Sequence, residues 1–248
     1  ENYMSSAPKL SIVTVVYNDL NALVKTVNSV VQLEFDDLEY LIVDGGSTDG
    51  TQEYIQSLSL PYLKWISEDD RGIFDAFNKG IKLATGAWVH LLNAGDVYNE
   101  SNVFSEIDFS VNKDFLCFSV LKRKKKDFIW YPEARYNNAF VDVSHPGLVV
   151  KRGYYLSVMM YSLEYKFISD SYFIWHNVSP DKSLLYETIL VDMADGGYST
   201  NWHLQHELEK QLLIISAQIS LINRLKLHLK YFLAGIYNFI IRKLPLRL

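Results

Sequence analysis

The sequence predicts an α/β protein with a Rossmann-like, mainly parallel central sheet and a C-terminal helical tail. Through the first half of the 248-residue chain, apolar β-branched stretches alternate with stretches whose apolar residues recur at helical spacing. Such alternation is typical of right-handed βαβ units, in which helices cover both faces of a sheet. A helical pattern without Gly or Pro then begins at Trp202 and continues up to Gly235.

Each expected element has its own signature along the chain. The first strand is the run KLSIVTVVY, and either Asn18 or Asp19 can cap the helix that follows it. In the first half, strands are expected at 9–17, 39–44, 63–68 and 87–93, and helices at 18–33, 51–59 and 72–84. In the second half, 114–120 and 127–132 are expected to form a hairpin with a basic tip, 147–152 a strand and 171–178 a helix.

Composition indicates a folded protein that stays in the cytoplasm. Hydrophobic residues make up 49% of the chain and charged residues 21%, which argues against a disordered protein. The single cysteine, Cys117, excludes an intramolecular disulfide and a cysteine-based zinc cluster, so a reducing compartment is the simpler expectation. The sequence does not open with the basic segment, apolar stretch and cleavage site of a secretory signal, so we do not expect secretion.

Charge is divided unevenly between the body and the tail. Residues 203–248 contain seven Lys and Arg but two Glu, whereas the remaining residues carry a surplus of ten negative charges. The apolar run 231–241 is too short to cross a bilayer, which needs roughly 20 residues, but it fits a helix lying in a membrane interface. A helix packed on the body or on a partner chain, which would support an oligomer, is the alternative. We expect a catalytic-type domain at 1–201 and an amphipathic tail at 202–248 that makes peripheral membrane contact.

Polar clusters follow all four strands expected in the first half. In a parallel α/β sheet, ligands bind beyond the carboxyl ends of the strands. The sequence therefore predicts one polar pocket built from adjacent strand ends. The four clusters are Tyr17–Asp19, Asp44–Ser47, Glu68–Arg71 and Asn93–Asp96.

The glycine turn after the second expected strand does not match two common nucleotide sites. Gly45 and Gly46 allow a sharp turn and a close approach to a ligand. However, GGSTDG lacks the G-x-G-x-x-G spacing of a dinucleotide site, and the chain contains no G-x-x-x-x-G-K-[ST] loop.

Five segments together resemble, in order and spacing, the family 2 glycosyltransferases. They are TVVYND, YLIVDGGSTDGT, DDRGIFDAFNKGIKLATGAWVHLLNAGD, SHPGLVVKR and ISDSYF, and the resemblance covers roughly residues 9–200. The similarity is greatest to the bacterial enzymes that assemble capsule, O-antigen or exopolysaccharide repeats. The resemblance implies the GT-A fold, a nucleotide-sugar donor, Mn²⁺ or Mg²⁺ as cofactor, and inversion at the anomeric carbon of the sugar.

The resemblance also implies a donor site at the strand ends. Tyr17 would lie against the nucleobase, or alternatively pack into the core, and Asp44 would accept a hydrogen bond from the ring N–H of a uracil or thymine. Asp75 and Asn78 share a helix face and would lie near the base, ribose or diphosphate. The expected donor contacts are Tyr17, Asn18, Asp44, Gly46, Arg71, Asp75, Asn78, Asn93, Ala94 and Asp96.

The acidic D-x-D type motif that the family places after its fourth strand is reduced here to Asn93-Ala94-Gly95-Asp96. Asn93 can still bond a ribose hydroxyl, because its amide both donates and accepts. Asp96 is the expected ligand of Mn²⁺ or Mg²⁺, since Mg²⁺ is commonly held by one or two carboxylates with phosphates and water. The alternative role of Asp96 is to cap a helix that starts near Ser101.

Asp170 is the expected catalytic base. An inverting transfer needs a group that takes the proton of the acceptor hydroxyl as it attacks the anomeric carbon, and Asp170 in ISDSYF matches the family's base. An N-cap role is the alternative, and the second acid that the family often has is replaced by Ser169 and Ser171. His145, in SHPGL, matches a histidine expected to face the acceptor or a donor phosphate, although it could also be structural.

The sequence therefore favours a metal-dependent, inverting glycosyltransferase that uses a UDP-linked donor in bacterial surface polysaccharide synthesis. The basic, apolar tail suggests an oligosaccharide or lipid-linked acceptor at the cytoplasmic face of the inner membrane, and no nucleic acid is expected as a partner. The main alternative is a non-catalytic nucleotide-sugar or glycan-binding module, because the acidic motif is thinned. A nucleotidyltransferase is disfavoured, because the Gly-rich loop with Arg or Lys that it carries after its first strand is missing.

Overall fold

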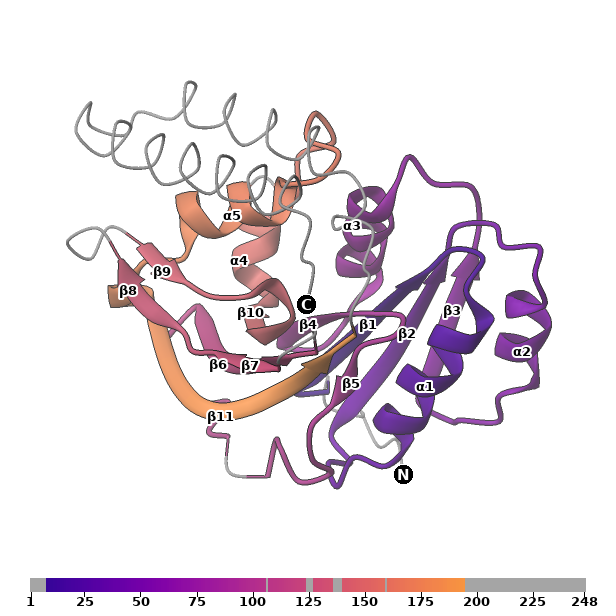
Figure 1. Cartoon of the computed structure of the whole chain (residues 1–248), viewed down its shortest axis with the longest axis horizontal. Coiled ribbons are helices and arrows are strands. Elements are labelled where there is room, and N and C mark those ends of the chain that lie inside the picture. Colours follow the sequence, from indigo (N-terminus) through magenta and orange to yellow (C-terminus); the bar gives the residue numbers. More distant parts are fainter. Residues whose placement is uncertain (1–7, 106, 124–126, 136–139, 159, 195–248) are drawn as a thin grey trace, which may run out of the picture. The chain divides into compact units, whose positions relative to one another are not determined.

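The computed structural model describes most of the chain up to residue 194 as one compact unit, a curled sheet with helices on both sides (Figure 1). The described residues are 8–105, 107–123, 127–135, 140–158 and 160–194. The expected tail at 202–248 lies outside them. Within the described ranges, no helix combines the length and the apolar character needed to cross a membrane.

In the described residues, the main sheet has nine strands in the order β3-β2-β1-β4-β10-β6-β11-β5, with β7 paired to β6. β1 to β4 are parallel, β10 is antiparallel to both neighbours, and β11 is parallel to β6. The strands are β1 (Leu10–Val16), β2 (Leu38–Asp44), β3 (Leu63–Ser67), β4 (Trp88–Asn93), β5 (Val97–Tyr98), β6 (Phe115–Lys122), β7 (Phe128–Trp130), β10 (Leu148–Lys151) and β11 (Ser183–Met193). β8 (Glu133–Arg135) and β9 (Phe140–Asp142) form a separate antiparallel pair.

Helices cover both faces of the sheet, and for this reason β1 and β2 are buried along their whole length. α1 and α2 pack on one face through side chains such as Val27 and Ile55, whereas α3, α4 and α5 pack on the other through Phe77, Tyr155 and Phe173. The helices are α1 (Leu20–Val31), α2 (Thr51–Ser57), α3 (Ile73–Leu83), α4 (Arg152–Ser157) and α5 (Ser169–Asn177), with 3₁₀ turns η1 (His145–Gly147) and η2 (Pro180–Lys182).

α3 approaches the sheet closely at Gly80. A Cβ atom at this position would collide with the Val13 side chain of β1. Any larger residue would therefore push α3 away from the sheet. Because α3 also carries Asp75 and Asn78, Gly80 determines how close these two side chains lie to the strands.

The expected mainly parallel α/β sheet is confirmed, and the elements expected between residues 9 and 93 are all present. Asp19 caps α1, and its carboxylate accepts the Ala22 N–H at 3.1 Å. The hairpin of β6 and β7, strand β10 and helix α5 also form where expected. β11 was not expected, because Glu187 and Thr188 interrupt the apolar pattern of its sequence. The pairing of β11 with β6 shifts register at this point.

A buried carboxylate ties together the amino ends of β1, β2 and β4, at the edge opposite the predicted site. Glu39 accepts the Ser11 hydroxyl at 2.5 Å, the Thr85 hydroxyl at 2.8 Å and the Gly86 N–H at 3.1 Å, and Lys64 lies 3.0 Å away. Burial alone would raise the pKa of Glu39, but the hydrogen bonds outweigh burial and lower the pKa to about 2. Glu39 therefore stabilises the folded state as an ion.

The variant Glu39→Gln tests this role through acid unfolding. Because the folded-state pKa lies below the ordinary value of 4.5, the stabilisation is complete above that pH and is lost as the pH falls toward 2. A shift of this size corresponds to about 3 kcal/mol of unfolding free energy. We expect urea denaturation at several pH values to give a flatter pH dependence for Glu39→Gln between pH 4.5 and 2. Glu53→Gln, on the exposed surface of α2, is the control, and equal curves for both variants would contradict the assignment.

Candidate functional site

The four parallel strands end side by side at the carboxyl edge of the sheet. In the register, Val16 pairs with Asp44 and Asp44 with Ser67, while Val15 pairs with Asn93 on the other side of β1. The strand order changes direction at β1, because β2 and β3 lie on one side of it and β4 on the other. Such a switch point leaves a crevice where ligands bind in α/β proteins. The structure therefore brings the predicted polar clusters to one edge.

Asp44 is a buried carboxyl side chain that links the carboxyl ends of three strands. Its carboxylate accepts the Ser47 N–H at 3.0 Å, the Ser67 hydroxyl at 2.5 Å and also the Ser47 hydroxyl. The Ser47 oxygen in turn accepts the Asn18 N–H at 2.7 Å. The loops that follow β1, β2 and β3 are thus joined around one carboxylate.

Asn18 and Gly46 give these loops their curvature. Asn18 has a φ of 49°, a left-handed conformation that Asn tolerates, and its side-chain oxygen accepts the Thr48 N–H at 2.8 Å. Gly46 has a φ of 82°, which side chains with a Cβ rarely adopt. Both residues were predicted as donor contacts, and both shape the rim of the site.

Tyr17 lies exposed next to the glycine turn. It is 65% exposed, so the alternative of a core aromatic is wrong. A Cβ atom at Gly45 would lie 2.6 Å from the Asp70 carboxylate and 3.3 Å from the Tyr17 ring. The missing side chain at Gly45 therefore leaves room for both the Asp70 carboxylate and the Tyr17 ring beside the glycine turn. Asp70 was not among the predicted contacts, because only its place in a polar cluster pointed to it.

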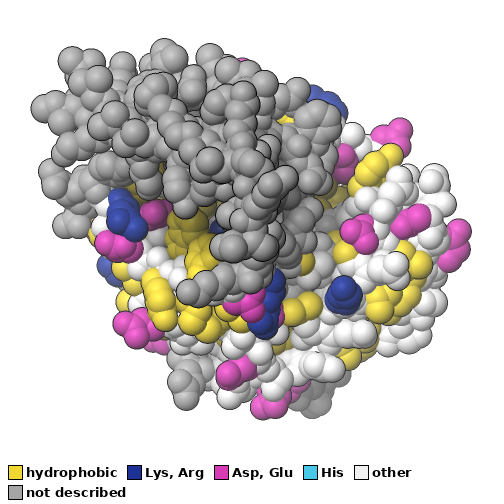
Figure 2. All heavy atoms as spheres, in the orientation of Figure 1, with side chains coloured by type: hydrophobic (Ala, Val, Ile, Leu, Met, Phe, Trp, Pro, Cys, Tyr) yellow, Lys and Arg dark blue, Asp and Glu magenta, His cyan; other side chains and the backbone are white. Residues whose placement is uncertain are grey.

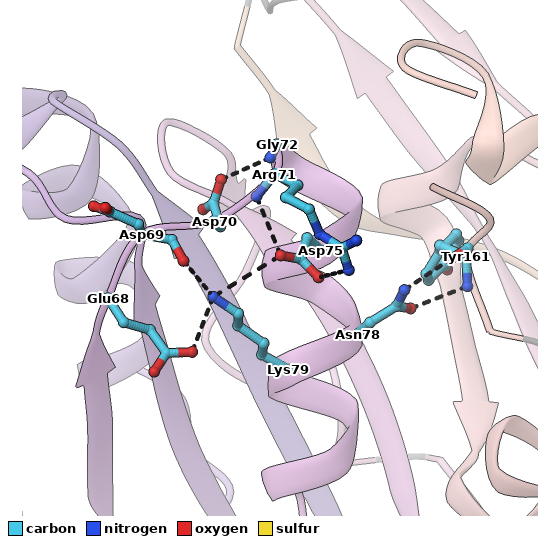
Figure 3. A network of polar contacts seen from close by, with 9 residues as sticks. All are labelled: Glu68, Asp69, Asp70, Arg71, Gly72, Asp75, Asn78, Lys79 and Tyr161. Carbon is cyan, nitrogen blue, oxygen red and sulfur yellow. Dashed lines mark hydrogen bonds and ion pairs between the residues drawn. The ribbon is translucent and has the colours of Figure 1, made fainter. Parts of the chain in front are cut away.

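The loop after β3 is held by side chains of α3 (Figure 3). Lys79 Nζ donates to the Asp69 carbonyl at 2.8 Å and lies 2.9 Å from the Glu68 carboxylate. Asp75 accepts the Arg71 N–H at 3.1 Å and lies 3.5 Å from the Arg71 guanidinium. Burial opposes the charge of Asp75, but these bonds and the Arg71 charge lower its pKa below the ordinary value. The Arg71 side chain stays 76% exposed, so its guanidinium is open to an anionic ligand.

The turn after β4 is docked on α1. The Thr26 hydroxyl donates to the Asp96 carbonyl at 2.8 Å and accepts the Gly95 N–H at 2.9 Å. The Ala94 N–H donates to the Val15 carbonyl at 3.2 Å. Residues 101–105 form turns and not a helix, so the alternative of a helix cap at Asp96 is wrong. The contact of Thr26 with this turn was not predicted, because in the sequence Thr26 is only one more residue on the buried face of α1.

The Asp96 carboxylate is buried, with the residue 4% exposed. It accepts the Asn93 side-chain N–H at 3.2 Å and the Ala194 N–H at 3.0 Å. Burial raises the pKa of Asp96 to about 6, against the opposing effects of these bonds and of the Lys122 charge. At neutral pH Asp96 is therefore ionised, although its burial disfavours the ionised form.

Two residues of this turn carry oxygen atoms of the kind that divalent cations bind. The Asn93 amide oxygen is buried and has no hydrogen-bond partner in the described part of the chain, while the amide nitrogen contacts Asp96. Hard cations take carboxylate and amide oxygens and complete their coordination with phosphates and water. In the same part of the chain, no three or more His, Cys, Asp or Glu side chains form a group that could hold a metal by themselves. Asn93 and Asp96 thus provide a partial ligand set that a diphosphate could complete.

Asp170 lies in the first turn of α5. The helix begins at Ser169, so Asp170 is not its N-cap, and its carboxylate accepts the Ser171 N–H at 2.7 Å. The Asp170 charge acts on two buried side chains: it opposes the burial that lowers the pKa of His145, and it adds to the burial that raises the pKa of Tyr161. Asp170 therefore lies within electrostatic range of both groups.

His145 belongs to a buried aromatic cluster. Its Nε2 lies 3.0 Å from the Tyr161 hydroxyl, and its ring centroid lies 5.1 Å from that of Phe77. The turn that carries His145 is fixed by His90 of β4, whose ring nitrogens lie 2.9 Å from the Pro146 carbonyl and 2.7 Å from the Tyr98 hydroxyl. The role of His145 at the acceptor or a phosphate stays a prediction.

Asn78 contacts the backbone of Tyr161 at both ends of its amide. The side-chain N–H donates to the Tyr161 carbonyl at 2.8 Å, and the side-chain oxygen accepts the Tyr161 N–H at 3.0 Å. Tyr161 was not singled out in the sequence, because a tyrosine in an irregular segment carries no local signal.

Comparisons with known proteins identify relatives by sequence. The model of a family described as Glycosyl transferase family 2 matches residues 11–173. An uncharacterized glycosyltransferase of Mycobacterium tuberculosis (strain CDC 1551 / Oshkosh) is 36% identical over 104 residues, which cover 42% of this chain and 40% of that protein. A PGL/p-HBAD biosynthesis glycosyltransferase of Mycobacterium bovis (strain BCG / Pasteur 1173P2) is 28% identical over 175 residues, covering 66% of this chain and 68% of that protein. The match thus spans less than half of the first relative.

Solved structures share the fold. A mannosyltransferase from Pyrobaculum calidifontis in complex with GDP-Man and Mn²⁺ gives a TM-score of 0.62 at 15% identity, covering 85% of this chain and 64% of that chain. Residues 1–349 of S. aureus TarS in complex with UDP give a TM-score of 0.59 at 16% identity, covering 87% and 68%. This likeness shows that the fold is GT-A. Because the family model matches more than half of the sequence, the chain belongs to glycosyl transferase family 2.

Proposed function

We propose that this chain is an inverting glycosyltransferase that moves a sugar from a UDP-linked donor to a hydroxyl group of a glycan acceptor. Membership of the family supports the reaction class. The observation that carries the proposal is the carboxyl edge of the sheet. There, an exposed aromatic ring, an exposed guanidinium and a buried acid lie at the ends of adjacent strands, and the acid lies beside an amide whose oxygen has no partner among the described residues.

The donor contacts follow from the chemistry of these groups. Tyr17 offers an exposed ring on which a nucleobase can stack, and Asp44 lies at the end of the neighbouring strand. Arg71 offers a guanidinium that suits a diphosphate. The TarS fragment was solved with UDP and with UDP-GlcNAc, which supports a uridine nucleotide here, whereas the Pyrobaculum enzyme was solved with GDP-Man.

Asn93 and Asp96 would hold Mn²⁺ or Mg²⁺ together with the two phosphates of the donor. Such a cation, when bound, stabilises the negative charge of the departing diphosphate. Two observations support this assignment: the Asn93 amide oxygen lacks a partner among the described residues, and the Asp96 charge is buried. The Mn²⁺ in the complex of the Pyrobaculum enzyme is consistent with it.

Asp170 would act as the base on the acceptor side. The acceptor oxygen forms a bond to the anomeric carbon, the bond from that carbon to the phosphate oxygen breaks, and the nucleoside diphosphate leaves with the electron pair. The proton of the acceptor hydroxyl passes to the Asp170 carboxylate. Attack from the face opposite the leaving group inverts the configuration.

The variant Asp170→Asn tests the catalytic assignment, because it keeps the shape of the side chain but removes the base. We expect sugar transfer to fall by roughly 10²- to 10⁴-fold. UDP should still raise the melting temperature as in the parent protein, because Asp170 is not a nucleotide contact. The measurement is donor turnover with a panel of nucleotide sugars and acceptors, with Asp36→Asn as the exposed control. Unchanged turnover in Asp170→Asn would reject the assignment.

A non-catalytic nucleotide-sugar or glycan-binding module is the second candidate. It is favoured by Asn93, which stands where the family often has an acid. Calorimetry with UDP and Mn²⁺, combined with a donor-hydrolysis assay, separates the two candidates. Binding without turnover on any acceptor would assign the binding module.

We further propose that the acceptor is a lipid-linked glycan of a surface polysaccharide and that the protein works at the cytoplasmic face of the inner membrane. The support is the basic, apolar sequence of 202–248, which lies outside the described residues. The rest of the chain carries a surplus of negative charge, and Asp and Glu side chains are spread over the visible described surface (Figure 2). Without residues 203–248, the chain should therefore be repelled by an anionic lipid surface.

Sedimentation with lipid vesicles tests this location. We expect the whole chain to sediment with anionic vesicles and to be released by high salt, since screening weakens charge attraction. A chain truncated after Trp202 should stay in the supernatant. Equal sedimentation of both chains, or none with the whole chain, would contradict the proposal.

A further inference from the structure

α3 lies between the donor loops and the segment that leads to Asp170. Asp75 and Lys79 are four positions apart on α3 and lie on the same side of the helix, whereas Asn78, next to Lys79 in the sequence, projects in a different direction. Asp75 and Lys79 hold the loop after β3 through Arg71 and Asp69. Figure 3 shows Asn78 facing away from that loop, toward Tyr161.

The contact between Asn78 and Tyr161 is a two-point clamp. The Asn78 amide bonds both the N–H and the carbonyl of Tyr161, at 3.0 and 2.8 Å, and Asn78 is only 9% exposed. Two parallel bonds to one residue fix its direction as well as its position. Tyr161 stands in an irregular segment, whose backbone groups find no partners from a regular helix or sheet.

The side chain of Tyr161 links this clamp to the elements around Asp170. Its ring stacks on Phe74 of α3 with centroids 5.7 Å apart, and lies 5.3 Å from Phe173 of α5. Its hydroxyl lies 3.0 Å from His145 Nε2 and 2.9 Å from the Tyr155 hydroxyl. Tyr161 is 2% exposed, so these contacts are shielded from water. α3, η1, α4 and α5 therefore meet on a single side chain.

Phe173 lies one turn beyond Asp170 on α5, on a helix of only nine residues. Fixing Phe173 and the segment before Ser169 leaves the first turn of α5 little freedom to move. α3 thus contacts both the loop after β3 and Tyr161, which packs on α5.

We propose that Asn78 and Tyr161 are positioning residues that place Asp170 relative to the nucleotide-sugar site, and that Asn78 acts through the Tyr161 backbone and not through the donor. This inference rests on the proposed function, since it assumes that Asp170 is the base. A transfer reaction is sensitive to such placement, because a shift of about 1 Å can cost 10²-fold in rate.

The variant Asn78→Ala tests the proposal in the whole chain. We expect kcat to fall by roughly 10- to 100-fold, because the base is misplaced. The Kd for UDP with Mn²⁺ and the donor KM should stay within about threefold, because no donor contact is lost. Faster amide hydrogen exchange across 161–168 should accompany the loss of kcat, since the clamp no longer protects this segment.

Asn177→Ala is the matched control. Asn177 also makes two hydrogen bonds, to the Phe173 carbonyl at 2.9 Å and from the Tyr154 hydroxyl at 3.2 Å, but it lies at the far end of α5. It should lower the melting temperature and leave kcat within about threefold, because neither bond holds Tyr161 or the segment that precedes α5. If Asn78→Ala does not fold, Tyr161→Phe replaces it, since it keeps the clamp and loses the hydroxyl bonds to His145 and Tyr155. Its kcat should then fall at least about threefold at unchanged UDP affinity.

Three outcomes would overturn the proposal while leaving an active parent enzyme. A rise of about tenfold or more in the Kd for UDP would make Asn78 a donor contact. An unchanged kcat would remove its positioning role, and equal losses in Asn78→Ala and Asn177→Ala would indicate general loosening of α5. A parent chain that binds UDP but transfers no sugar would instead overturn the proposed function, and the positioning proposal would fall with it.

Discussion

β4 is hydrogen-bonded along both of its edges and connects the two halves of the main sheet. β4 runs parallel to β1 on one side and antiparallel to β10 on the other, so it joins the regular α/β half to the mixed half. This pairing places the turn after β4 in the middle of the carboxyl edge. His90 of β4 also links the two halves, because its buried ring lies within hydrogen-bond distance of the Pro146 carbonyl and the Tyr98 hydroxyl. A change in β4 would therefore move both halves of the site.

Glu39 and Asp96 are buried carboxylates at opposite edges of the sheet, and their pKa values are shifted in opposite directions. Glu39 receives bonds from three residues of the chain besides the Lys64 contact, and its pKa falls to about 2. Asp96 receives two hydrogen bonds, from Asn93 and Ala194, and its pKa rises to about 6 because burial prevails. Keeping the Asp96 charge buried costs about 3 kcal/mol at neutral pH by the size of this shift. A bound cation would offset that cost, whereas Glu39 is already fully compensated.

The parts of the fold that depend on local pattern could be predicted from the sequence. The alternation of strands and helices, the cap at Asp19 and the polar strand ends all follow from the period of apolar residues and from turn chemistry. The contacts that join distant segments could not, because Asn78 and Tyr161 are 83 positions apart and Asp96 and Ala194 are 98 apart. The Thr26 hydroxyl under the turn after β4 and the interrupted pattern of β11 were missed for the same reason: tertiary contacts determine them.

We propose that Asp96 would hold a divalent cation together with the donor diphosphate. Calorimetric titration of UDP into the parent protein and into Asp96→Asn, each with and without Mn²⁺, tests it most directly. We expect Mn²⁺ to tighten UDP binding at least about tenfold in the parent, which corresponds to about 1.4 kcal/mol. In Asp96→Asn this gain should disappear, while the affinity without metal stays within about threefold. An equal gain from Mn²⁺ in both proteins would show that Asp96 does not hold the cation.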